Sequence, residues 1–426
     1  MLIPIRMTAK CGAIALVLAG ASPSSASADG LAPMQTLPAQ ATLGFERVRL
    51  PDRETMGLLG ASYLVEISPG WWAGPALYGA ATGRRGGLFT WGAEARRNWR
   101  LGEFWAVAAG FYAGGGGGAN APVGGGLMLR PHVDLMRDFG GFAAGITASQ
   151  VHFPSGSIHS SQLGAQVTLA HDFGFIAPGQ AGRSAAGSGG LGMERMELVV
   201  GRYGAASGSG SGNPNALGFV GMRFHRRLDA VMAATLEAAG AATGSADGYA
   251  ETLVGLQALW PLGNDAFRIG VRGAAGLGGG GAVPTGGGPI AKLALAGRLD
   301  FNPQWSLGLD AGRARALNGG FDSPYAQLSL GRALVDAPPC CAMAAATSTV
   351  HDMEWALSLQ DVLRAQRRDG SVRPMSVLGL KFRRSVNETV YLSGQAHSAI
   401  GGGAGAYSAG LVGLGVGTGL ATASPW

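Results

Sequence analysis

Hydrophobic and polar residues alternate with a period of two along much of the chain. Within residues 290–301, Leu293 and Leu295 share one face, while Lys292 and Arg298 occupy the other. The same alternation occurs in residues 127–139, 267–272 and 378–383. A period of two is typical of β-strands with one apolar and one polar face.

The segments between these alternating stretches are of two kinds. Short polar turns are expected at residues 100–103, 138–141, 226–229, 261–265, 302–304 and 385–388. Glycine-rich connections lie at residues 83–87, 114–126, 207–215, 278–288 and 401–405. Because the two kinds alternate along the chain, they predict an up-and-down antiparallel meander with tight turns at one end and longer loops at the other.

The chain also matches itself at a nearly constant spacing. A shift of 162 residues superposes Pro122 on Pro284, and a shift of 158 residues carries Phe224 onto Phe382. These matches preserve the order of strands and turns and indicate an internal repeat. We expect two and a half copies of an eight-strand unit, at residues 42–175, 193–333 and 351–420.

The repeat sets the expected fold, which is all-β: one large antiparallel up-and-down transmembrane barrel of about twenty strands, within a range of 18–22. Residues 29–41 are expected to be a periplasmic segment before a barrel that covers 42–426. The linkers 176–192 and 334–350 fall on the periplasmic side by strand parity. Each linker is expected to contain a short extra element and to offer a surface to a periplasmic partner.

Composition agrees with a membrane barrel and excludes other classes. Of 426 residues, 75 are Gly, 47% are hydrophobic and 14% are charged, with a net charge of +6. Disordered chains have fewer apolar residues and more net charge. Residues 1–28 resemble a secretory signal peptide, because Arg6 and Lys10 precede a short apolar run that ends at small residues. We find no later apolar run of about 18 residues, so only a closed barrel is expected to cross a bilayer.

Aromatic residues gather near the short turns. A belt of Trp and Phe at one end of the strands is typical of a membrane interface. The alternative is a soluble secreted β-sandwich with these side chains in its core. The candidate interface residues are Trp71, Trp72, Trp99, Trp105, Phe139, Trp260, Phe301, Trp305 and Phe382.

The polar faces of the predicted strands carry more basic than acidic residues. A basic lining biases a pore towards anions, so we expect a mild anion preference. The alternative is that inward charges pair with acids and only stabilise the wall. The candidate lumen-facing residues are Arg96, Arg130, Arg195, Arg223, Arg268, Arg272, Lys292, Arg298, Lys381 and Arg383.

The sequence contains few candidates for catalysis. His152 and His159 flank a loop close to Ser160 and Ser161, which is the place to expect an acyl hydrolase. A nucleophile also needs a base and an orienting group, and no such set is apparent. The Gly-x-Gly stretches are not followed by Lys-Ser/Thr, so they are not phosphate loops. We therefore expect no enzyme activity, catalytic residue, metal site, cofactor or nucleic-acid partner.

These features together resemble the Gram-negative outer-membrane β-barrel class, including porins, in which the last strand often ends in Phe or Trp, as Trp426 does here. The resemblance implies an outer-membrane location, contact with lipid and lipopolysaccharide, and insertion by the barrel assembly machinery. It also implies a passive pore or transport conduit for small or polymeric solutes. The alternative is a surface structural or adhesion barrel without transport.

Overall fold

The computed structural model describes residues 31–177, 180, 183–186, 189–204, 216–244, 246–335, 347–349, 353–367, 369–385 and 389–417. The expected signal peptide, most of the second linker and Trp426 lie outside these ranges. The expected N-terminal segment 29–41 is partly strand, because the first strand begins at Met34. Within the described ranges, no helix has the length and apolar character needed to cross a membrane.

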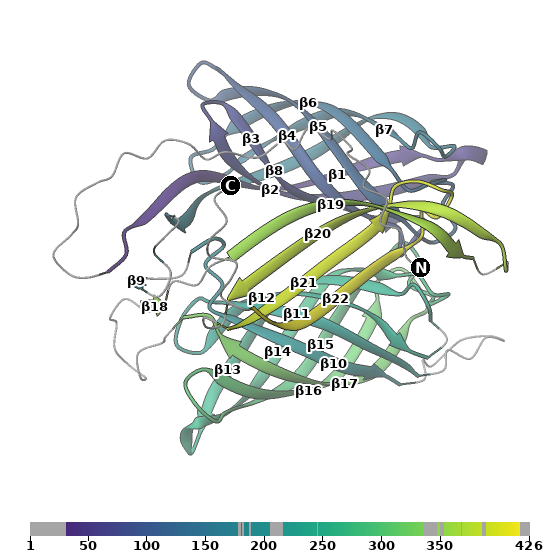
Figure 1. The fold of residues 1–426 in the computed structure, drawn as a ribbon. Helices are drawn as coiled ribbons and strands as arrows, with labels where there is room; N and C mark the ends of the chain where they lie inside the picture. Colours follow the sequence, from purple (N-terminus) through teal and green to yellow (C-terminus); the bar gives the residue numbers. More distant parts are fainter. Residues whose placement is uncertain are drawn as a thin grey trace, which may run out of the picture.

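The first eight strands close on themselves to form barrel 1, the purple to blue unit in Figure 1. The meander is closed by antiparallel pairing of the first strand with the eighth, with Thr42 opposite Thr168. A single-turn helix, η1 (Pro51–Arg53), joins the first two strands. The strands are β1 (Met34–Arg49), β2 (Thr55–Ser68), β3 (Trp71–Thr82), β4 (Phe89–Leu101), β5 (Trp105–Gly117), β6 (Met128–Asp138), β7 (Ala143–His152) and β8 (His159–Ile176).

A second closed ring of eight strands, barrel 2, follows with the same topology. Here Val199 lies opposite Ser329 where the first strand of the ring meets the last. The strands are β10 (Arg195–Tyr203), β11 (Leu217–Arg227), β12 (Met232–Thr243), β13 (Ala250–Leu262), β14 (Asn264–Gly279), β15 (Pro289–Asp300), β16 (Trp305–Ala316) and β17 (Asp322–Ala333).

The remaining four long strands form an antiparallel sheet that does not close, which we call the open sheet. They are β19 (Met353–Gln366), β20 (Val372–Ser385), β21 (Val390–Ala399) and β22 (Ser408–Val416). Two short strands, β9 (Ser184–Ala186) and β18 (Thr347–Thr349), pair with each other, so the two linkers meet in a small sheet of their own.

The all-β antiparallel fold is as predicted, but the single ring of about twenty strands is not. The long strands are divided into two closed barrels and the open sheet. Period-two alternation fixes which side chains point inwards, and it carries no information on which strand completes a ring. Closure is decided by pairing between residues more than a hundred positions apart, such as Thr42 and Thr168, whose hydroxyl oxygens are 2.9 Å apart.

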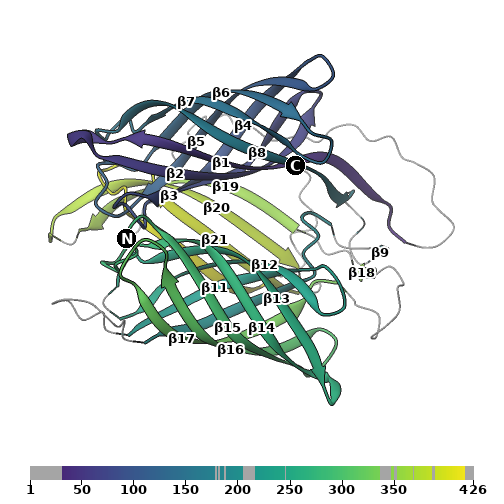
Figure 2. The ribbon, with the colours of Figure 1, turned by 180° about the vertical axis from the view of Figure 1, so that it is seen from behind.

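The glycine-rich connections bring the three units together. The amide of Gly86 in barrel 1 donates to the carbonyl of Gly286 in barrel 2, and the amide of Gly405 beside the open sheet donates to the carbonyl of Gly124. Strands also touch, since β3 contacts β14 and β5 contacts β20 and β21. In both ribbon views the open sheet lies between the two barrels (Figures 1 and 2). All three units therefore have their glycine-rich ends at one end of the molecule.

Candidate functional site

Both barrels have charged side chains inside and apolar side chains outside. On β15, Leu293 and Leu295 are 67% and 68% exposed, whereas the neighbouring Lys292 is buried. Leu163 on β8 and Val254 on β13 are likewise exposed on the outer wall. In water this arrangement would expose far more contiguous apolar surface than soluble proteins tolerate. It is the arrangement expected of strands whose outer face contacts lipid.

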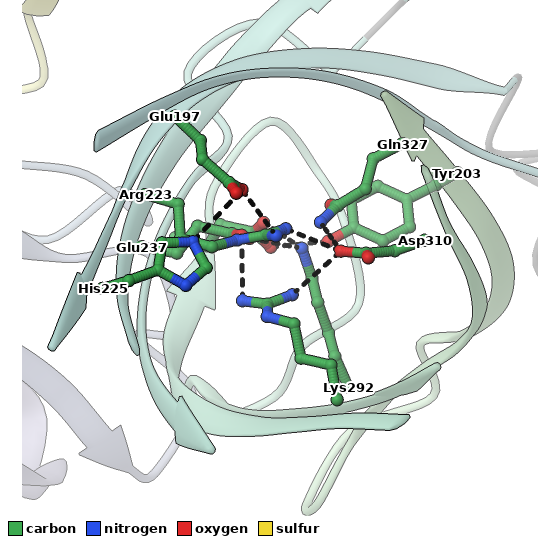
Figure 3. A network of polar contacts seen from close by, with 10 residues as sticks. Glu197, Tyr203, Arg223, His225, Glu237, Lys292, Asp310 and Gln327 are labelled. Atoms are coloured by element: carbon green, nitrogen blue, oxygen red, sulfur yellow. Dashed lines mark hydrogen bonds and ion pairs between the residues drawn. The ribbon is translucent and has the colours of Figure 1, made fainter. Parts of the chain in front are cut away.

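A network of ion pairs fills the interior of barrel 2 (Figure 3). Arg223 is at its centre: Nε donates to Glu237 at 2.8 Å, Nη1 to Glu197 at 3.1 Å and Nη2 to Asp310 at 2.8 Å. Arg272 donates a further bond to Glu237 at 2.9 Å. The acids come from β10, β12 and β16, so the network ties together strands on different sides of the ring.

Lys292 continues this network towards the glycine-rich end. Its Nζ donates to Glu251 at 2.5 Å and lies 5.1 Å from the ring centroid of Tyr203. Tyr203 and Tyr249 also donate their hydroxyls to Glu251, each at 2.7 Å. The ammonium is therefore paired and enclosed by aromatic rings, a favourable setting for a desolvated cation.

Barrel 1 contains a smaller network of the same kind. Arg130 makes two parallel hydrogen bonds to Glu46 at 2.9 and 3.0 Å. It lies on the sixth strand of barrel 1, and Lys292 lies on the sixth strand of barrel 2. The Arg130 guanidinium also donates to the hydroxyl of Tyr78. His132 contacts Asp134 at 3.0 Å. The cavity among these residues is about 20 Å³, enough for about one water molecule.

Buried charges nearly cancel in both interiors. Barrel 1 buries three carboxylates against two guanidinium groups and a histidine, namely Glu46, Glu94, Asp134, Arg96, Arg130 and His132. Among the described residues, barrel 2 buries four carboxylates against three cations and a histidine, namely Glu197, Glu237, Glu251, Asp310, Arg223, Arg272, Lys292 and His225. An eight-stranded barrel is just wide enough for its side chains to fill. These side chains thus occupy the interior where the sequence predicted a continuous lumen.

The ten predicted basic residues do not line one passage. Five are buried inside the closed barrels, where ion pairs hold them: Arg96, Arg130, Arg223, Arg272 and Lys292. Three others gather at the turn end of barrel 2. The last two, Lys381 and Arg383, lie on the open sheet.

The cluster at the turn end of barrel 2 has more positive than negative charge. The Asp300 carboxylate forms ion pairs with Arg298 at 3.0 Å, Arg195 at 3.5 Å and Arg268 at 3.9 Å. These arginine side chains are 16–19% exposed, so this mouth of the barrel remains accessible to solvent. One carboxylate cannot neutralise three guanidinium groups, and this cluster therefore carries a net positive charge.

The open sheet has a polar face that the register defines. Gln395 lies opposite Lys381, and Glu354 lies opposite Arg383. His397, two residues along from Gln395, contacts its side-chain oxygen at 3.1 Å. Directly opposed residues share a face. Lys381 and Arg383 are therefore on the same face of the open sheet, among polar side chains.

Most of the predicted interface aromatics lie on the outside, at the turn end. Trp71, Trp99, Trp105, Phe139, Trp260 and Phe301 are exposed, and Trp305 and Phe382 are partly exposed. Arg97 lies 5.1 Å from the ring of Trp71, as expected where a cation meets an interfacial ring. Trp72 differs from the prediction because it is buried. Adjacent strand residues point to opposite faces, so Trp71 and Trp72 cannot both face outwards.

The side chains of the histidine loop contact each other and the backbone. His152 and His159 contact each other. The hydroxyl of Ser160 accepts a bond from the amide of Arg49, and that of Ser155 accepts one from the amide of Gly125. Both hydroxyls are therefore engaged with the backbone. The part of the chain that the structure describes contains no cluster of three metal-ligating side chains.

Two carboxylates at the centre of the interiors, Glu46 and Glu237, are not among the residues predicted from the sequence. Each is the main partner of a buried arginine. Glu237 is the one charged residue of β12, whose other residues are apolar, small or uncharged. A lone acid at an inward position of such a strand is the signal that would have identified it.

No protein-family model matches the chain, and no curated protein does. Solved structures that it resembles include outer-membrane porins and channels and a ferric enterobactin receptor. The NanC porin is 9% identical, with 69% of this chain and 98% of that one covered and a TM-score of 0.18. The outer-membrane channel DcaP of Acinetobacter baumannii is 8% identical over 73% and 100% of the chains, with a TM-score of 0.22. OccK8 (OprE) of Pseudomonas aeruginosa is 9% identical over 90% and 97%, with a TM-score of 0.21.

The resemblance is thus to outer-membrane porins and channels as a class and to no single family. At TM-scores of 0.18–0.22 it carries no argument about mechanism.

Proposed function

We propose that the protein is an outer-membrane conduit for small anionic solutes, and that its path follows the polar face of the open sheet. In this proposal the apolar exterior contacts the lipid bilayer and its lipopolysaccharide, the barrel assembly machinery inserts the chain, and the linkers face a periplasmic partner. The two closed barrels are packed supports beside the path.

The observation that carries the proposal is the uneven distribution of unpaired basic charge. In barrel 2, the guanidinium of Arg223 is neutralised by three carboxylates within 3.1 Å. Lys381 and Arg383 have no ion pair within the described residues, and Arg383 instead stacks 4.1 Å from the ring of Tyr391. Basic residues that are not neutralised by the protein attract anions and bias permeation towards them.

Reversal potentials in planar bilayers with a salt gradient test the proposal. The protein is expected to conduct with anion preference, and Lys381→Glu with Arg383→Glu is expected to move the reversal potential towards cations. The matched control is Arg313→Glu, a charge reversal at a side chain that is 62% exposed and pairs with Asp322 outside the open sheet. Cation preference in the parent protein, or equal effects of both changes, would contradict the proposal.

A second candidate is a structural barrel without transport, which the packed interiors favour. If the barrels only stabilise or anchor the outer membrane, filled interiors with balanced charge are sufficient. This function predicts no conductance above the lipid background, together with a loss of envelope integrity in a deletion strain.

A further inference from the structure

The open sheet ends in two strands that each pair on one side only. Within the described residues, β19 pairs with β20 and β22 pairs with β21, and neither has a second neighbour. In the hydrocarbon region no water is present to bond the free N–H and C=O groups of an edge, and each unsatisfied group costs several kcal/mol. A membrane-embedded sheet with two open edges therefore requires further strands.

The two faces of the open sheet indicate what kind of structure those strands complete. Leu357, Leu359 and Leu414 are on the apolar face and are 67%, 75% and 77% exposed. Lys381 and Gln395 are on the polar face. This is the same outward-apolar, inward-polar arrangement as in the closed barrels. The additional strands must therefore enclose the polar face and leave the apolar face towards lipid.

The open sheet corresponds to the first half of a closed barrel in this same chain. Gly221 on β11 and Gly379 on β20 coincide at a shift of 158 residues, and each lies on the second strand of its unit. Their partners on the third strand are Ala239 and His397. A side chain on either glycine would collide with that partner. Four strands thus match strands one to four of a unit that closes at eight.

We propose that a second copy of this chain closes the open sheet into a further eight-stranded barrel, with four strands from each copy. In a four-strand meander the first and last strands run in opposite directions. A two-fold axis along the barrel therefore places β22 of one copy antiparallel to β19 of its partner, and the reverse pair forms across the axis. The same axis keeps both copies in one orientation in the membrane.

The partner is a second copy because the two exposed edges complement each other. A closed two-fold ring uses both edges and leaves none free. It would also bury Leu411, which is 54% exposed although it lies opposite Gln395 on the polar face. The interface is main-chain pairing at two edges, continuous with the antiparallel sheets already present.

The inference deepens the proposed function, since the completed barrel encloses the face on which Lys381 and Arg383 lie. The edges need partners whether or not solutes pass.

The first test is stoichiometry: the full chain in detergent or lipid nanodiscs is analysed by native mass spectrometry. Two copies per particle are expected. A monomer would overturn the proposal, and so would three copies, which would instead make a twelve-stranded ring.

The second test locates the contact. Cys340 and Cys341 are replaced by Ser, and Leu411→Cys is placed in one tagged copy while Glu354→Cys, Ser358→Cys or Gln360→Cys is placed in another. A short bis-maleimide is expected to join differently tagged copies for at least one of these positions. Ser149→Cys, inside barrel 1, serves as the control that should not react across copies. The absence of a cross-link between differently tagged copies at all three positions would overturn the proposal.

The two proposals fail separately. A dimer with the β19 to β22 cross-link and no conductance would contradict the conduit and leave the shared barrel standing. A conducting monomer would contradict the shared barrel and leave the conduit standing.

Discussion

The amide of Gly86 in barrel 1 donates a 2.9 Å hydrogen bond to the carbonyl oxygen of Gly286 in barrel 2. Next to it, a Cβ atom on Gly87 would lie 2.1 Å from the backbone nitrogen of Gly280. The two barrels therefore meet backbone to backbone, with no room for side chains. Glycine is needed at this contact because a Cβ atom there would collide with the facing backbone.

Gly87→Ala is expected to weaken the contact between the barrels. Gly87 has φ +95°, so alanine introduces backbone strain of about 1–2 kcal/mol. The collision with Gly280 adds about 1–3 kcal/mol. Thermal unfolding in detergent measures the sum. Gly102→Ala is the matched control, because Gly102 has φ +82° and a Cβ atom added there would meet nothing within 4 Å. Equal losses for the two variants would mean that the contact contributes nothing.

Removing one acid from the centre of barrel 2 is expected to be severely destabilising. Glu237 accepts bonds from Arg223, Arg272 and Lys292, so Glu237→Gln leaves three buried cations short of a carboxylate. Breaking a buried ion pair by removing one partner costs about 3–5 kcal/mol. Urea unfolding followed by tryptophan fluorescence measures the change.

The control for this variant is Asp322→Asn, which breaks the exposed pair with Arg313 at 2.8 Å. Solvent screens that pair, so a much smaller change is expected. If Glu237→Gln were no more destabilising than Asp322→Asn, the buried network would not stabilise the barrel.

The turn between β11 and β12 gives a pH-dependent prediction outside the strands. The amides of Val231 and Met232 donate to the Asp229 carboxylate and lower its pKa below the ordinary 3.8. Because the folded pKa is the lower one, the turn is stabilised above about pH 4 and loses this contribution as the pH falls through the folded pKa. Carboxyl chemical shifts of Asp229 in micelles report its titration. A midpoint at or above the ordinary value would contradict the assignment.

The alternation of side chains along a strand follows from the sequence, whereas ring closure does not. The inward position of Arg130, Arg223 and Lys292 follows from parity alone, since neighbours on a strand point to opposite faces. The partners of these cations could not be predicted in the same way, because Glu46 reaches Arg130 across 84 positions in the sequence. Which strands pair at the closure depends on such distant contacts.

In the open sheet too, the faces follow from the sequence and the grouping of strands does not. Its alternation predicted that Lys381 and Arg383 lie on one polar face, which the register shows. A predicted total of about twenty strands is compatible with several ways of grouping the strands into closed rings. Only the pairing of β1 with β8 and of β10 with β17 distinguishes two small barrels from one large one.

The closure of the first eight strands on themselves is tested most directly by a disulfide between β1 and β8. With Cys340 and Cys341 replaced by Ser, Thr42→Cys and Thr168→Cys are introduced at opposed positions inside barrel 1. Two closed barrels predict an intramolecular disulfide under mild oxidation, seen as a reductant-sensitive shift in gel mobility. The pair Thr42→Cys and Ser329→Cys, which joins barrel 1 to barrel 2, should give none. If the first pair stayed reduced while Thr168→Cys cross-linked to a cysteine on β10, the strands would form one continuous ring and the two-barrel architecture would be wrong.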